Sequence, residues 1–192
     1  MINLILLASG YGKRFGENKL LFEIDGMPMY RHILDRLQNV SKKCICGHEV
    51  KLTVVTQYEE IISYCSKADI FSIYNGNADE GISASIKLGI MNANDCEWYF
   101  FFVADQPYLE EETIDGFITS VLTSDKKLAS VCHGDIPGNP TAFKREFKQD
   151  LLELKADTGG RSVLKRHLNE ILWYEISKKE IRDIDDKNET HL

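Results

Sequence analysis

The stretch NLILLASGYGKRFGENK, from Asn3 to Lys19, decides the fold. It opens with an apolar run at positions 4–8, which is typical of a parallel strand buried on both faces. Glycines follow at positions 10, 12 and 16, and they let a backbone turn tightly and approach a ligand closely. Lys13, Arg14 and Lys19 place three cations in or just after this turn. Backbone N–H groups together with positive charge suit an oligophosphate. Ligands of open α/β sheets bind at this end of a strand, so the stretch predicts a phosphate-binding loop.

Two common phosphate-binding fingerprints do not fit this loop. The dinucleotide pattern G-x-G-x-x-G is one residue shorter than the spacing here and does not carry two cations inside it. The P-loop pattern ends in Gly-Lys-Ser/Thr. Here Lys19 stands between Asn18 and Leu20, so the magnesium-binding hydroxyl is missing. A glycine-rich surface turn with solvated charges is the simpler alternative.

Composition places the chain among ordinary soluble globular proteins. Its 192 residues fit one domain over positions 1–192, and they can bury a large core. The formal net charge of -7 argues against a nucleic-acid groove or an anionic membrane surface as the main partner. The apolar start at positions 2–8 is too short for a signal or spanning segment, so a cytoplasmic location is expected.

Five cysteines are scattered along the chain, and an odd, scattered set suggests reduced thiols in a cytosolic protein. Cys44, Cys46 and His48 form C-x-C-x-H, but no second cluster with zinc-like spacing completes it. A solvent-side connection between a helix and a strand is the favoured interpretation. His133 and His167 have no partner suggested by the sequence and are taken as structural.

Strand and helix patterns alternate along the chain, which indicates an α/β fold with a mainly parallel sheet. No repeat, low-complexity linker or domain boundary interrupts them. The expected strands cover residues 4–8, 52–56, 70–74, 98–104, 128–132 and 172–176. The expected helices begin near Pro28 and cover residues 29–37, 58–66, 82–91, 113–122, 144–154 and 160–168.

A carboxylate follows the most apolar strand directly, in Val103-Ala104-Asp105-Gln106-Pro107. Asp105 is therefore expected at the carboxyl edge of the sheet, beside the glycine loop. Magnesium prefers oxygen ligands and takes one or two protein carboxylates beside phosphates, and Asp105 is placed for that role. The alternative is an aspartate that starts a turn before proline.

Two further segments carry polar groups after predicted elements. In Asn75 to Ser85 a strand ends in turn formers and enters a helix, which Ser83 or Asp79 could cap. Near the end of the chain, Asp183, Asp185 and Asp186 form an acidic group, for which a solvated tail is the plain alternative.

These motifs, in this order, resemble the nucleotidyltransferases with a glycosyltransferase-A-like, Rossmann-type fold. Their signature, LAxGxGxRxGxxK, matches the first loop except for Ser9, where the family usually has alanine. The resemblance runs from Leu4 to Asp186 and is strongest to the molybdenum cofactor cytidylyltransferase branch. It implies a three-layer α/β/α architecture with a mainly parallel mixed sheet.

The resemblance also implies a role for each matching residue. Lys19, Arg14 and Asp105 would be catalytic, and Asp105 would bind Mg²⁺ with Asp185 as second ligand and Asp183 close behind. Nucleotide binding would involve Leu7, Ala8, Ser9, Gly10, Gly12, Lys13, Arg14, Gly16, Lys19, Asn75, Glu80, Gly81, Ser85 and Asp105. The acceptor would lie against Gln106, Pro107, Gly138, Asn139, Pro140, Gly160 and Arg161, although Ala156 replaces the first glycine of the family's last motif.

The implied activity is magnesium-dependent transfer of CMP from CTP to the terminal phosphate of molybdopterin, with or without molybdenum, and release of pyrophosphate. A molybdenum hydroxylase that receives the cofactor is the implied protein partner. Guanylyl transfer to the same cofactor and nucleotidyl transfer to a sugar or polyol phosphate are the alternatives within the class. A nucleotide- or cofactor-binding accessory protein without turnover is the alternative from another class.

Overall fold

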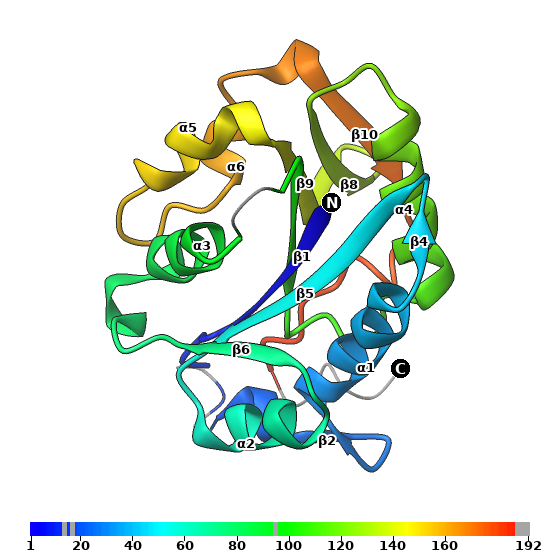
Figure 1. The fold of residues 1–192 in the computed structure, drawn as a ribbon. Coiled ribbons are helices and arrows are strands. Elements are labelled where there is room, and N and C mark those ends of the chain that lie inside the picture. Colours follow the sequence, from blue (N-terminus) through cyan, green and yellow to red (C-terminus); the bar gives the residue numbers. More distant parts are fainter. Residues whose placement is uncertain (13–14, 16–17, 94–95, 187–192) are drawn as a thin grey trace.

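An eight-stranded mixed sheet forms the centre of the protein in a computed structural model that describes residues 1–12, 15, 18–93 and 96–186. The strand order is β10-β8-β9-β7-β1-β5-β4, and β6 also pairs with β5 (Figure 1). The strands are β1 (Ile2–Ala8), β4 (Cys44–Ile45), β5 (His48–Thr56), β6 (Phe71–Tyr74), β7 (Trp98–Val103), β8 (Leu128–His133), β9 (Ile136–Lys144) and β10 (Ile171–Glu175).

Six α-helices and four short 3-10 helices occur in the described part of the chain. They are α1 (Met29–Ser41), α2 (Glu59–Lys67), α3 (Ile82–Met91), α4 (Glu111–Thr123), α5 (Lys148–Leu152) and α6 (Arg161–Leu164), with η1 (Lys19–Leu21), η2 (Ala78–Glu80), η3 (Arg145–Phe147) and η4 (Leu168–Glu170). A separate two-stranded hairpin, β2 (Glu23–Ile24) with β3 (Met27–Pro28), leads into α1.

Alternation along β1 divides the core into two layers, because successive side chains of a strand point to opposite faces. Leu4 and Leu6 pack in the cluster that contains the buried sides of α1, α2 and α4. Ile5 and Leu7 pack in the cluster that contains α3, α5 and α6. Figure 1 shows the sheet between these two groups of helices. The predicted three-layer α/β/α architecture with a mainly parallel mixed sheet is therefore confirmed.

The central strands β7, β1, β5 and β6 are parallel, so their carboxyl ends meet at one edge. Strand β9 runs antiparallel to both β7 and β8, and the sequence did not predict it. Its segment IPGNPTAFK contains two prolines and a glycine, which are depleted in strands. Proline has no N–H to donate to a neighbouring strand, and glycine has no side chain to pack. The pairing shifts register between Ser130 and Cys132, next to this proline-rich part.

The expected helices at 144–154 and 160–168 are much shorter in the structure. Residue 144 ends β9 and residues 145–147 form η3, so helix α5 has only five residues. Helix α6 has four residues. Burial of Leu151, Val163 and Leu164 ties these single turns to the sheet, because tertiary packing rather than helical propensity stabilises short helices.

The C-x-C-x-H segment forms a β-hairpin. Cys44 pairs with Glu49, and Cys46 and Gly47 make the turn with φ of 48° and 79°. Positive φ at both positions is the requirement of a type I′ hairpin turn. Cys44 and Cys46 are exposed, and all five cysteines are free thiols.

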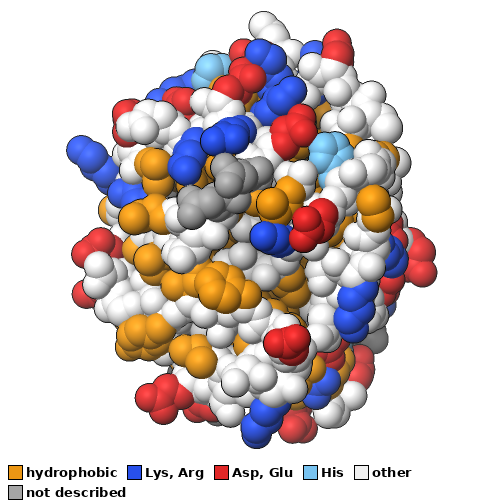
Figure 2. All heavy atoms as spheres, in the orientation of Figure 1, with side chains coloured by type: hydrophobic (Ala, Val, Ile, Leu, Met, Phe, Trp, Pro, Cys, Tyr) orange, Lys and Arg blue, Asp and Glu red, His pale blue; other side chains and the backbone are white. Residues whose placement is uncertain are grey.

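Basic and acidic side chains are interspersed on the face of the molecule seen in Figure 2. No broad basic surface forms on that face, in keeping with the net charge of -7. Among the described residues, no helix has the length and apolar character needed to cross a membrane.

Packing of α3 on β1 generates a prediction. A Cβ at Gly89 would lie 2.6 Å from Cγ2 of Ile5, a side chain that is fully buried. Gly89→Ala should therefore destabilise the protein by about 1–3 kcal/mol through overpacking, less a gain of up to about 1 kcal/mol in helical propensity. Chemical denaturation measures this change. Gly116→Ala in α4 is the matched control, because its Cβ would meet only the hydroxyl end of Tyr174. Equal stability of the Gly89 and Gly116 variants would contradict close packing at Gly89.

Candidate active site

The glycine loop after β1 is fixed by side chains from the end of β5. The carbonyl of Ala8 accepts a hydrogen bond from Thr56 Oγ1 at 2.8 Å, and the carbonyls of Ser9 and Gly10 accept from Gln57 Nε2 and Tyr58 Oη, both at 2.7 Å. Three consecutive carbonyls are thus held by three consecutive side chains. The sequence analysis missed these three supports, because hydroxyl and amide side chains after a strand carry no distinctive signal.

A cavity of about 560 Å³ opens at the carboxyl ends of β1 and β7. Its lining includes the glycine loop at Ser9, Gly10 and Gly12, as the sequence predicted. Leu7 and Asp105 also line it, whereas Ala8 is buried beneath. The structure therefore brings the first loop and the end of the apolar strand together around one cavity. Predicted residues Lys13, Arg14 and Gly16 lie outside the described residues.

Lys19 binds both predicted metal-binding carboxylates. Its Nζ donates to Asp105 Oδ2 at 2.7 Å and to Asp185 Oδ1 at 2.9 Å, and it lies 3.3 Å from the carbonyl of Ile184. Asn18 accepts from the N–H of Leu20 and caps η1, which starts at Lys19. Burial by itself would lower the pKa of Lys19, but the ion pairs with the two aspartates outweigh it and raise the pKa. The side chain is therefore a buried cation.

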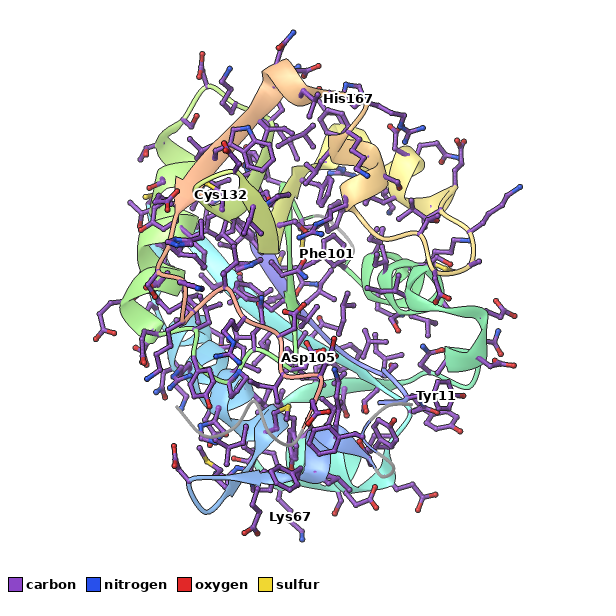
Figure 3. The ribbon with its side chains drawn as sticks, turned by 180° about the vertical axis from the view of Figure 1, so that it is seen from behind. Tyr11, Lys67, Phe101, Asp105, Cys132 and His167 are labelled. Carbon is purple, nitrogen blue, oxygen red and sulfur yellow. The ribbon has the colours of Figure 1, made fainter. Side chains whose placement is uncertain are left out.

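Ile184 anchors the C-terminal segment at the site. Its side chain is fully buried in the core, and its N–H donates to the carbonyl of Asp105 at 2.9 Å. The flanking residues Asp183 and Asp185 are placed beside Asp105 as a result. Figure 3 shows Asp105 at the end of its strand, next to this C-terminal segment. Asp183 and Asp185 are thus held beside Asp105, whereas Asp186 is exposed and lines neither cavity.

Asp183 has an unusual environment. The residue is exposed, but its carboxyl lies beside Asp105 and Gln106, where partial removal from solvent, together with the negative charge of Asp105, raises the pKa of Asp183 to about 6. A hydrogen bond from Gln106 and the charge of Lys19 act in the opposite direction. Asp105 and Asp185, in contrast, share the cation.

The opposite wall of the cavity comes from η2 and the start of α3. Gly81 has φ of 91°, and a Cβ there would lie 2.5 Å from Asp157 Oδ1. Only glycine fits, and the N–H of Ser83 then binds the carbonyl of Ala156 at 3.2 Å. The N-cap residue of α3 is Gly81, so neither predicted cap, Ser83 nor Asp79, caps this helix.

Two carboxylates, Asp79 and Asp157, line this side of the cavity. Asp157 follows Ala156 in the motif that the resemblance placed at the acceptor, but the loop after α5 brings it to the start of α3. Ser85 also lines the cavity and accepts a hydrogen bond from Asn75 Nδ2 at 2.9 Å. Asn75 is 1% exposed, and its Oδ1 accepts a hydrogen bond from the N–H of Asn77. It therefore stabilises the turn without lining the cavity. Glu80 is exposed on η2 and is not part of the described lining.

A second cavity of about 300 Å³ lies on the other side of Asp183. Gly138, Asn139 and Arg161 line it, in agreement with the predicted acceptor segments. Lys178 and Arg182, which the sequence did not suggest, add basic groups, and His133, which was taken as structural, also lines this cavity. Pro140 is buried and is joined to Asn139 by a cis peptide bond. Neither Pro140 nor Gly160, which precedes α6, lines this cavity.

Gln106 and Pro107, also predicted to bind the acceptor, are buried. Gln106 is 1% exposed and donates to the carbonyl of Ile181 at 3.1 Å. The carbonyl of Pro107 accepts from Arg36 Nη1 at 2.6 Å. Both residues hold the loop after β7 in place, and neither lines a described cavity.

Comparison with known proteins is consistent with this geometry. A family model described as the MobA-like NTP transferase domain matches residues 4–171. The chain belongs to this family. It is therefore a nucleotidyltransferase, as its resemblance in sequence had implied. A probable molybdenum cofactor guanylyltransferase of Pyrococcus horikoshii is 30% identical to this MobA-like chain over 156 residues, which cover 77% of the chain and 72% of the relative. A probable molybdenum cofactor guanylyltransferase of Thermococcus gammatolerans is 28% identical, over 86% of the chain and 81% of the relative.

Solved structures show the same fold. A nucleotidyl transferase from Methanothermobacter superposes with a TM-score of 0.77 and 19% identity, covering 98% of the MobA-like chain and 93% of its own. A CMP:2-keto-3-deoxy-manno-octonic acid synthetase complexed with CTP superposes with a TM-score of 0.75 and 14% identity, over 98% and 95%. The glycosyltransferase-A-like nucleotidyltransferase fold is therefore confirmed.

The raised pKa of Asp183 predicts a pH effect on stability. The folded protein holds this proton up to about pH 6, whereas the ordinary value for the unfolded chain is 3.8. Stability contributed by the bound proton is present below pH 3.8 and is lost as the pH rises through 6. Asp183→Asn should remove this loss, so the melting temperature of the variant should rise relative to the parent across that window. Asp125→Asn, on an exposed turn, is the control. A constant difference from the parent at all pH values would contradict the raised pKa.

Proposed function

We propose that this MobA-like enzyme transfers GMP from GTP to the phosphate of a molybdopterin-type cofactor and releases pyrophosphate. An oxygen of the acceptor phosphate forms a bond to the α-phosphorus of GTP, and the bond from that phosphorus to the leaving pyrophosphate breaks. The observation that carries the proposal is the convergence of Asp105 and Asp185 on Lys19, which lines the glycine-loop cavity together with Asp105. Such catalysis consists of positioning and charge neutralisation.

Magnesium fits the oxygen atoms gathered at this point. Asp105 Oδ2, Asp185 Oδ1 and the carbonyl of Ile184 all lie within 3.3 Å of one cationic nitrogen. Hard cations prefer such an all-oxygen set, and magnesium usually takes one or two carboxylates beside substrate phosphates. Asp105 and Asp185 would hold the ion. A bound Mg²⁺ would neutralise the charge of the phosphates and hold them in line for displacement.

The two cavities suggest how donor and acceptor are arranged. The glycine loop and Lys19 would hold the triphosphate in the larger cavity. The basic groups Arg161, Lys178 and Arg182 of the smaller cavity would attract an anionic acceptor. Asp105 lines the larger cavity and the nearby Asp183 lines the smaller one, so the acceptor phosphate would approach the α-phosphorus beside these carboxylates.

Two observations support GTP over the CTP that the sequence resemblance implied. The curated relatives described above are named guanylyltransferases. Asp79 also lines the cavity, and a carboxylate can accept from both the N1–H and the 2-amino group of guanine. Glu80, the other carboxylate between residues 75 and 85, is not in the described lining. Cytosine offers one amino group on its corresponding edge, so it would use such a carboxylate less fully.

Competition among nucleotides tests the base. GTP should bind about tenfold more tightly than CTP or inosine triphosphate at fixed magnesium, because neither of these offers Asp79 both guanine donors and a hydrogen bond to a charged group contributes roughly 1.5–3 kcal/mol. Asp79→Asn should abolish most of this preference, and Glu80→Gln, an acidic neighbour outside the described lining, should keep it. Displacement of a fluorescent nucleotide measures all three. A preference for CTP would instead assign the enzyme to cytidylyl transfer and leave the phosphate chemistry unchanged.

Turnover tests the catalytic group. Asp105→Asn and Lys19→Ala should each lower pyrophosphate release from GTP and a molybdopterin-type acceptor by on the order of a hundredfold, the scale of one lost electrostatic contact in a transition state. Both kcat and kcat/KM should fall. Circular dichroism checks folding, and Asp125→Asn serves as a control carboxylate on a distant turn. Near-parental turnover of a folded Lys19→Ala enzyme would contradict its assignment.

A further inference from the structure

Lys19 occupies the point on which the proposed metal ligands converge. Its Nζ lies 2.7 Å from Asp105 Oδ2 and 2.9 Å from Asp185 Oδ1. Lys19 is only 7% exposed. Ion pairs between two fully exposed side chains contribute little to stability, and the pairs of Lys19 therefore differ from them. The ammonium neutralises two carboxylates that would otherwise repel each other in a partly buried site.

The stem of Lys19 is held against the glycine loop. A Cβ at Gly12 would lie 3.0 Å from Cγ and 3.2 Å from Cβ of Lys19, and Gly12 has φ of 55°. The loop therefore packs on the first carbons of the side chain. Movement of Lys19 is confined to its distal methylenes and the ammonium. Since Lys19 also lines the larger cavity, this movement can carry the ammonium from the carboxylates toward bound phosphates.

The same carboxylate oxygens cannot serve both cations. A magnesium ion is held at about 2.0–2.1 Å from its oxygen ligands. An ammonium hydrogen-bonded to those oxygens lies in the space that such an ion needs, and the two positive charges repel each other at that separation. One cation therefore has to leave before the other binds.

We infer that Lys19 is the resident counter-ion of the Asp105–Asp185 pair and exchanges partners during the reaction, releasing the carboxylates to a divalent cation and binding the phosphates of the nucleotide. This inference rests on the proposed function. The exchange makes metal binding depend on nucleotide. Without phosphates to receive it, Lys19 stays on the carboxylates and keeps the affinity for the metal low. Nucleotide and metal therefore bind with positive coupling.

Manganese binding without nucleotide tests the exchange. Mn²⁺ alone is titrated into the parent protein and into Lys19→Met, with detection by electron paramagnetic resonance and calorimetry. The variant should bind Mn²⁺ roughly ten- to a hundredfold more tightly, the effect of removing one charge-assisted hydrogen bond that competes for the ligands. Mn²⁺ should also raise the melting temperature of the variant by more than that of the parent, because the unpaired carboxylates regain a cation.

Two further variants complete the test. Arg182→Met removes a positive charge from the smaller cavity beside Asp183 without freeing the carboxylate pair, and it should raise the Mn²⁺ affinity less than Lys19→Met does. Lys19→Gln, which keeps a hydrogen-bond donor, replaces Lys19→Met if the latter does not fold. Equal Mn²⁺ affinity in the parent and the folded Lys19 variant, or equal gains in the Lys19 and Arg182 variants, would overturn the exchange and leave the metal site standing. Absence of Mn²⁺ binding in every protein, with GTP still bound, would instead overturn the magnesium site itself.

Discussion

The ion triad of Lys19 with Asp105 and Asp185 joins three parts of the chain that lie 86 and 166 positions apart. One is the glycine loop after the first strand, one is the end of the central strand, and one is the C-terminal segment. Burying a lysine is costly unless its charge is paired and hydrogen-bonded, and here both carboxylates and a carbonyl meet that requirement. Removing one partner would leave charge uncompensated in the site. The triad therefore holds the active site together as well as supplying its charges.

The balance of charge in the larger cavity supports the divalent cation proposed above. Of the described residues in its lining, three are aspartates and one, Lys19, is a cation. A nucleoside triphosphate brings further negative charge into this space, and like charges at close range repel strongly where water is partly excluded. One lysine cannot neutralise both the aspartates and the phosphates. The proposed ion, entering with the nucleotide, would offset this repulsion at the oxygen atoms that Lys19 would release.

The sequence predicted the parts of this site that depend on local pattern. Buried strands with continuous apolar runs, the glycine loop, Lys19 and the carboxylate at Asp105 all follow from residue type and spacing. Strand β9 did not, because Pro137, Gly138 and Pro140 hide its extended conformation and its antiparallel neighbours are fixed only by the tertiary fold. The position of Asp157 was also hidden, since a loop that crosses from α5 to α3 leaves no periodic signal. Likewise, the sequence could not show that one lysine would pair with both aspartates.

The proposed function assigns phosphate chemistry and base selection to different elements of this fold. Lys19, Asp105 and Asp185 come from the loop after β1, the end of β7 and the C-terminal segment. The base side is formed by η2, the start of α3 and the loop that carries Asp157. Substitutions at Asp79 or Asp157 can therefore alter the nucleotide without disturbing the ion triad. The first loop matches the signature of the whole nucleotidyltransferase class, which concerns phosphate binding and does not identify the base. The resemblance to the cytidylyltransferase branch and the guanylyltransferase names of the curated relatives are therefore compatible with the same first loop. In the proposed function, the base would be selected by a few side chains on the opposite wall.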